Sequence, residues 1–105
     1  MKILLDQGVP VPLRLPLAGH LVSTAHELGW SRLQNGDLLA AAERQFDVFI
    51  TTDRNLRYQQ NLTNRKLAIL VLPTTSWRVI QRHVAAVEGA LQNLHPGEYH
   101  ELTFP

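Results

Sequence analysis

The sequence contains no cysteine, and that absence excludes several classes of protein at once. Without thiols the chain has no disulfide framework, no thiolate zinc site and no cysteine nucleophile. Its charge is also nearly balanced, with ten Lys and Arg against nine Asp and Glu, so no strong overall field marks a nucleic-acid or membrane partner. Any attraction for RNA or DNA must therefore be local.

Long apolar runs and several catalytic motifs are missing as well. The first apolar run, residues 3–5, is far too short for a signal sequence, and no run approaches the roughly 20 residues of a membrane span. There is no phosphate-cradling glycine loop, no Gly-x-Ser-x-Gly elbow and no HExxH spacing among the five histidines. We therefore expect a cytoplasmic protein without a membrane segment, formed by one domain over residues 1–105.

Short apolar runs are present, and they predict the sheet. Val48, Phe49 and Ile50 follow one another without a polar residue, which is typical of a strand covered on both faces in a parallel sheet. Similar runs predict strands at residues 2–5, 21–24 and 67–72, and residues 99–104 indicate a final edge strand. We expect the order 2-1-3-4 for the first four strands.

Helices are expected between the strands. Asn35 is a good N-cap for a helix that leads into the strand at Val48, and Ser76 is a good cap for a long helix that reaches Leu94. The apolar stripe of that long helix either packs on its own sheet or forms a dimer seam. Shorter helices are expected within residues 12–17 and 54–62. The resulting class is α/β, with a mainly parallel sheet and helices on both faces.

Carboxylates follow two of the predicted strands directly. Asp6 ends the first apolar run and Asp53 follows Ile50-Thr51-Thr52, so both are expected at the carboxyl edge where open α/β sheets bind ligands. Converging carboxylates repel one another, and a divalent cation with a preference for hard oxygen ligands, Mg²⁺ or Mn²⁺, relieves the repulsion. The alternative is that each Asp caps the turn that follows its strand.

Two further acids and a basic cluster are candidates for the same site. Asp37 lies in the first turn of the Asn35 helix, where it either joins the site or simply stabilises the helix dipole, and Glu27 is a weaker candidate. The basic residues between positions 54 and 66 either clamp a phosphate backbone or form a solvated helix face; they are Arg54, Arg57, Arg65 and Lys66.

Four segments together resemble small PIN-like domains: residues 1–7, 27–30, 35–39 and 51–56. PIN-like domains are relatives of the PIN nucleases, and many are predicted toxins of bacterial toxin-antitoxin pairs. The resemblance implies a three-layer α/β fold and an acidic Mg²⁺ or Mn²⁺ site that cleaves RNA. The resemblance also implies that Asp6 and Asp53 are metal ligands, that Asp37 is the third ligand, and that Asn35 and Asn55 are supporting polar groups.

The chain departs from the family pattern at three positions. Gly8 replaces an Asn, Asn35 replaces an Asp with Asp37 two places later, and Asn55 replaces the second Asp of an Asp-x-Asp. Each exchange of Asp for Asn removes a negative charge and weakens the hold on a metal. The segment Tyr58-Gln59-Gln60-Asn61 resembles a mark of one subgroup, and its role is not explained by the sequence.

Two functional hypotheses follow from these features. The first is a PIN-like, metal-dependent endoribonuclease, the toxin of a toxin-antitoxin pair, with RNA as substrate and an antitoxin protein as partner. The alternative is a catalytically degenerate module that binds RNA or protein without turnover. A homodimer is also expected, because the last helix and the final edge strand leave surfaces uncovered in so small a domain.

Overall fold

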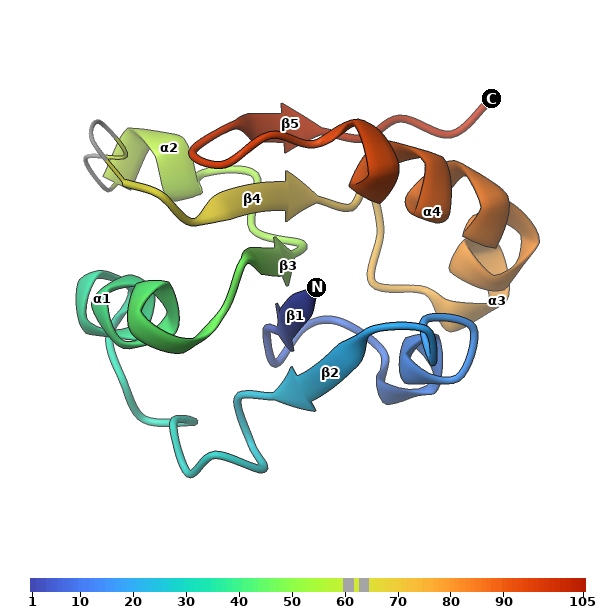
Figure 1. Cartoon of the computed structure of the whole chain (residues 1–105). Coiled ribbons are helices and arrows are strands. Elements are labelled where there is room, and N and C mark those ends of the chain that lie inside the picture. The colour runs from blue at the N-terminus through green and yellow to red at the C-terminus, as the bar shows by residue number, and fades with distance from the viewer. Residues whose placement is uncertain (60–61, 63–64) are drawn as a thin grey trace.

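The chain folds around a five-stranded parallel sheet with the strand order β2-β1-β3-β4-β5 (Figure 1). The computed structural model describes residues 1–59, 62 and 65–105. The strands are β1 (Lys2–Leu5), β2 (Leu21–Thr24), β3 (Val48–Thr51), β4 (Ala68–Val71) and β5 (Tyr99–Glu101). The α/β class and the expected 2-1-3-4 order are thus confirmed, and β5 extends the sheet beyond β4.

The inner strands are apolar on both faces because both faces are covered. Alternate residues of β3 separate into two cores, with Val48 and Ile50 in one cluster and Phe49 in the other. The first cluster also contains Ile80, Val87 and Leu91 from the C-terminal helices, whereas the second contains Leu38, Leu39 and Ala42. Because successive strand residues point to opposite faces, a run of three bulky residues serves both layers.

The helices divide between these two faces as the core clusters require (Figure 1). One face carries α1 (Asn35–Gln45) and α2 (Leu56–Gln59), and the other carries the 3₁₀ helix η1 (Val11–Arg14) together with the C-terminal helices. Those C-terminal elements are α3 (Trp77–Ile80), the 3₁₀ helix η2 (Gln81–His83) and α4 (Val84–Asn93). The side chains of the Tyr58–Asn61 segment lie outside the described residues.

Two expected helix boundaries are corrected by the structure. Asn35 is not the N-cap of α1: the carbonyl of Gln34 already accepts the Leu38 N–H at 2.7 Å, so the cap lies one residue earlier. The helix expected within residues 12–17 is the 3₁₀ helix η1, in which Leu15 donates to the Pro12 carbonyl three residues back. Pro16 lacks the N–H that a regular α-helix there would donate to the Pro12 carbonyl.

The long helix expected after Ser76 is interrupted. The Ser76 hydroxyl accepts the Val79 N–H at 3.3 Å, which confirms the predicted cap. The helix breaks at His83, where φ is −124° and the imidazole stacks on Phe104 with ring centroids 4.4 Å apart. The apolar stripe nevertheless packs on its own sheet, since Val87 and Leu91 are buried in the first core cluster.

Within the described part of the chain, no helix has both the length and the apolar character needed to cross a membrane.

Candidate functional site

Asp6 and Asp53 both leave the sheet at the carboxyl edge, after neighbouring strands. β1 and β3 pair in parallel with Leu5 opposite Ile50, so Asp6 lies beside Thr51 at the end of β3. The backbone N–H of Asp6 continues the ladder by donating to the Ile50 carbonyl at 2.9 Å. Both aspartates are half-buried, so the edge holds them partly out of water while leaving their carboxylates reachable.

The Thr51 hydroxyl connects the two aspartates. Its O–H donates to Asp6 Oδ2 at 2.7 Å, and its oxygen accepts the Asp53 N–H at 3.1 Å. Thr51 is completely buried, so water does not compete for these hydrogen bonds. A bond from a buried hydroxyl to a carboxylate is short and strong, and it fixes the orientation of the Asp6 side chain relative to β3.

Each aspartate also organises its own loop. Asp6 Oδ1 accepts the Gln7 N–H at 2.9 Å, and Asp53 Oδ1 accepts the Asn55 N–H at 2.9 Å. The turn-capping role that the sequence allowed for Asp53 is therefore present. Within the described part of the chain, no hydrogen bond engages Asp53 Oδ2.

Gly8 lets the two loops approach each other closely. A Cβ built on Gly8 would lie 2.7 Å from Thr52 Oγ1, closer than real side-chain carbons come to an oxygen. An Asn at this position, as in the PIN-like pattern, would require Thr52 to move. Glycine is thus the residue that this packing of the β1 loop against the β3 loop accepts without adjustment.

Asp37 does not complete a three-membered acidic group with Asp6 and Asp53. Its side chain is exposed in the first turn of α1, and among the described residues no three His, Cys, Asp or Glu side chains gather as a metal centre would need. Asn35 is half-buried at the start of the same helix, and Asn55 contributes its backbone N–H to Asp53. Thr51 therefore links two carboxylate residues, Asp6 after β1 and Asp53 after β3.

The four basic residues do not form one cluster. Arg54 stays beside the site and donates from Nη2 to the Pro73 carbonyl at 2.9 Å, while the guanidinium of Arg57 lies 5.7 Å from the centroid of the Tyr99 ring. Arg65 and Lys66 precede β4 and therefore lie at the amino edge of the parallel sheet, about 13 Å or more from the carboxyl edge for a four-residue strand. Glu43 forms an ion pair with Arg65 there at 3.5 Å.

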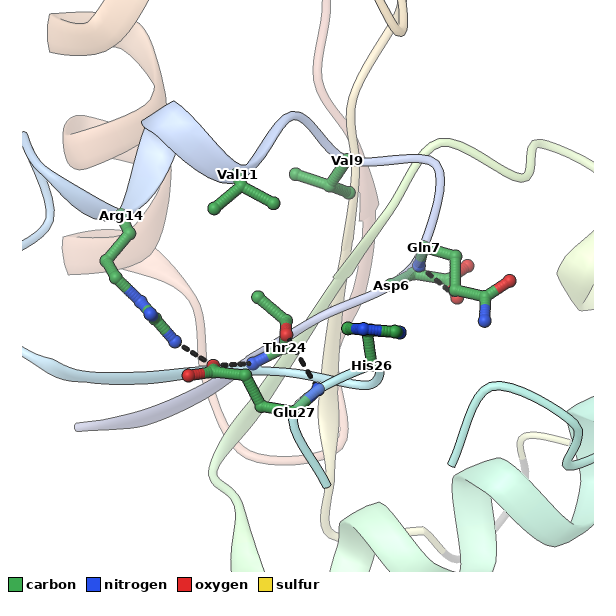
Figure 2. A pocket seen from close by; sticks show the side chains of 8 residues that line it. All are labelled: Asp6, Gln7, Val9, Val11, Arg14, Thr24, His26 and Glu27. Carbon is green, nitrogen blue, oxygen red and sulfur yellow. Dashed lines mark hydrogen bonds and ion pairs between the residues drawn. The ribbon is translucent and has the colours of Figure 1, made fainter. Parts of the chain in front are cut away.

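A pocket of about 410 Å³ opens directly beside Asp6 (Figure 2). One part of its lining comes from the segment after β1, with Gln7, Val9 and Val11, and another from the end of β2 and the residues that follow, with Thr24, His26 and Glu27. Val9 is buried, whereas Val11 is 58% exposed and presents an apolar wall to solvent. The pocket therefore combines aliphatic surface with carboxylate, amide and imidazole groups.

Glu27 is held at this pocket by three contacts with two residues, Thr24 and Arg14. Its Oε1 accepts the Thr24 N–H at 2.9 Å, its own N–H donates to Thr24 Oγ1 at 3.1 Å, and Arg14 forms an ion pair with the same Oε1. The hydrogen bond from Arg14 lowers the pKa of Glu27 below its usual value, and the backbone bond from Thr24 lowers the pKa further. Glu27 is therefore ionised at neutral pH.

Comparisons with known proteins leave the family open. No family model, no curated protein and no solved structure matches the chain. The PIN-like assignment accordingly stays a prediction from the four sequence segments.

Four residues of this region were not assigned a role from the sequence. Thr51 could have been found, because it is the last residue of a strand expected to lie beside the strand that ends at Asp6. Arg14, Gln7 and His26 carried no signal, since their position depends on how the loop after β1 and the loop after β2 fold over the sheet edge. Glu27 was named as a weaker candidate, and it lines the pocket beside Asp6.

Proposed function

We propose that the carboxyl edge formed by β1 and β3 binds Mg²⁺ or Mn²⁺ and that the protein is a PIN-like endoribonuclease, acting as the toxin of a toxin-antitoxin pair. The observation that carries the proposal is the Thr51 hydroxyl, which ties Asp6 to the chain segment of Asp53 at the edge where parallel sheets place ligands. The turn after β3 does not need the hydrogen bond from the buried Thr51 hydroxyl to Asp6, so this bond indicates that the orientation of the Asp6 carboxylate matters.

The residues at this edge fit such a cation. Asp6 and Asp53 supply hard carboxylate oxygens, and Asp53 Oδ2 is not engaged by another group of the described chain. Mg²⁺ is commonly held by one or two carboxylates, with waters and substrate phosphates as its remaining ligands. Two carboxylates are therefore sufficient, and Asp37 is not needed as a third.

The chain's own groups have separable tasks in this proposal. Thr51 orients Asp6, as hydrogen-bonded groups behind metal ligands do, and Arg54 lies next in sequence to Asp53, where its charge attracts the RNA backbone. The bound cation supplies Lewis-acid activation of the phosphodiester and lowers the pKa of attacking water. Arg65 and Lys66 lie at the opposite edge and serve no phosphate held at Asp6.

The test is RNA cleavage by purified protein with Mn²⁺, with and without a chelator. We expect cleavage that stops on chelation and falls at least 100-fold in Asp6→Asn, since loss of a ligand carboxylate removes both binding and charge stabilisation. Arg65→Gln is the matched control, because it removes a charge at the amino edge and should leave the rate unchanged. Cleavage that persists in the chelator would refute the metal mechanism.

One observation favours a second function, a degenerate module that binds RNA or protein without turnover. Within the described residues no three His, Cys, Asp or Glu side chains gather as a metal centre would need, and Asn35 and Asn55 stand where the family pattern has Asp. Calorimetric titration with Mn²⁺ separates the two functions. A degenerate site gives no heat of binding at millimolar Mn²⁺, whereas the nuclease gives a saturable isotherm that Asp53→Asn abolishes.

A further inference from the structure

The pocket beside Asp6 has the volume and the lining chemistry of a site for a small ligand with a polar ring. Its volume of about 410 Å³ falls in the range of small-ligand pockets, about 300–1,000 Å³. Val9 and Val11 offer aliphatic surface to the face of a ring, and the imidazole of His26 offers an aromatic one (Figure 2). Splayed RNA bases are recognised in this way, by stacking on their faces and hydrogen bonds along their edges.

The polar groups of the pocket have unused hydrogen-bonding capacity. Every hydrogen bond of the Glu27 side chain within the described chain uses Oε1, which leaves Oε2 as an acceptor. Gln7 donates through Nε2 to the Ser31 carbonyl at 3.1 Å, which fixes the amide and leaves its carbonyl oxygen as a second acceptor. The free oxygen of the ionised Glu27 carboxylate favours a ligand edge that carries an amino group, whereas Gln7 lies at the opposite end of the lining (Figure 2).

We propose that this pocket is a nucleobase subsite that takes the amino-bearing edge of adenine or cytosine and rejects uracil. The proposal rests on the proposed function, because the base belongs to the nucleotide whose phosphate lies at Asp6 and Asp53. Carboxylates accept hydrogen bonds from the cytosine amino group in nucleic-acid complexes, and the adenine amino group presents the same donor. Uracil has a carbonyl oxygen at that position, which faces the Glu27 carboxylate without a proton between them.

The subsite is tested without metal and without phosphate, so that its outcome is independent of catalysis. The full chain, labelled with ¹⁵N, is titrated with adenosine, cytidine and uridine, and amide shifts are followed by NMR. We expect adenosine and cytidine to bind about tenfold more tightly than uridine, the low end for one hydrogen bond to a charged group at a half-exposed site. The shifts should be largest at residues 7–9 and 24–27.

Two variants identify the groups responsible. Glu27→Gln retains a side chain able to close the turn with Thr24, and the discrimination should fall to within about twofold because a carboxamide can donate to the uracil carbonyl as well as accept. Glu88→Gln is the matched control, since it removes the same charge from α4 outside the pocket and should leave the tenfold preference intact. Val11→Ala, which removes aliphatic surface from the exposed wall, should weaken the binding of all three nucleosides together.

The outcomes separate this proposal from the nuclease function. Equal binding of the three nucleosides, or shifts confined to residues outside the pocket, would overturn the subsite even if RNA is cleaved. Tenfold discrimination that Glu27→Gln removes would support the subsite even if no RNA is cleaved, and the protein would then be a nucleotide-binding module.

Discussion

Replacing Thr51 by Val tests the hydroxyl that connects the two aspartates. Valine has nearly the same shape as threonine, so the buried site stays filled while Asp6 Oδ2 loses its donor and the Asp53 N–H loses its acceptor. A hydrogen bond to this half-buried carboxylate contributes about 1.5 kcal/mol, the low end for a charged group, and the bond from the Asp53 N–H contributes about 1 kcal/mol. The added methyl recovers about 0.8 kcal/mol by burial. We expect a net loss of about 2 kcal/mol in the free energy of unfolding.

The loss is measured by urea unfolding followed by the fluorescence of Trp30 and Trp77. For a domain of this size 2 kcal/mol corresponds to a fall of about 10 °C in Tm, well above experimental error. Thr51→Ser controls for packing, because it keeps the hydroxyl and removes only a methyl group, and it should lose about 1 kcal/mol. The slope of free energy against urea should stay constant in both variants.

A double-mutant cycle with Asp6→Ala isolates the bond itself. If the Thr51 hydroxyl acts on the Asp6 carboxylate, Thr51→Val should cost at least about 1 kcal/mol less in the Asp6→Ala background than in the parent. The same substitution should weaken Mn²⁺ binding by about 10- to 100-fold, as loss of a group behind a metal ligand does. An equal cost in both backgrounds, or a Thr51→Val protein as stable as the parent, would refute the reasoning.

Three other predictions address the loops and turns around the sheet. In Asp53→Ala the Asn55 N–H loses its acceptor, and thermal unfolding should show that the free energy of unfolding falls by about 1 kcal/mol. Asp53→Asn keeps the cap and should leave the stability of the metal-free protein unchanged or raised. The same variant should abolish Mn²⁺ affinity and any cleavage. The pKa of Glu27 is lower in the folded state than in the unfolded state, so the ion pair stabilises the fold above about pH 4.3, the pKa of a free glutamate. This stabilisation is lost as the pH falls through the folded pKa. The difference in Tm between the parent and Glu27→Gln should therefore shrink in acid. Gly97→Ala should lower the free energy of unfolding in urea by about 1–3 kcal/mol, because φ is +79° and the new Cβ would lie 2.7 Å from the Arg65 carbonyl oxygen. Gly29→Ala is the control, with φ of +74° but open space around the new Cβ, and it should lower the free energy of unfolding by about 1 kcal/mol. A Gly97 variant no worse than the Gly29 variant would contradict the clash.

The sheet could be read from the sequence because its inner strands are buried on both faces. Such strands lose the polar alternation that would make them resemble edge strands, and the run Val48-Phe49-Ile50 therefore identified the centre of the sheet. Helix boundaries were less accurate, since the start of α1 depends on which carbonyl first accepts an N–H, and Gln34 is as able to do so as Asn35. His83, where the helix breaks, stacks on Phe104, more than 20 residues away, and no local sequence pattern indicates such a contact.

The basic residues illustrate a different limit. Positions 54–66 are close in sequence, and one of the two interpretations of that closeness was a single phosphate clamp. The connection between two parallel strands must carry the chain from one edge of the sheet back to the other, so Arg54 and Lys66 lie at opposite edges. Residues at the two ends of one crossover connection therefore lie at opposite edges of the sheet, although they are close in sequence. Of these basic residues, Arg54 is the one next to Asp53.

Asp53 was expected to be either a cap or a metal ligand, and its two oxygens make these roles compatible. Oδ1 closes the turn by accepting the Asn55 N–H, and Oδ2 has no hydrogen-bond partner in the described chain, so a cation can take the second oxygen without opening the turn. Instability of an alanine variant would consequently say nothing against metal binding. A metal ligand is distinguished by the effect of the metal on stability. When only the folded state binds Mn²⁺, the metal at 100 times its Kd raises the free energy of unfolding by about 2.7 kcal/mol. That increment should be present in the parent and absent from Asp53→Asn, although both proteins keep the capped turn.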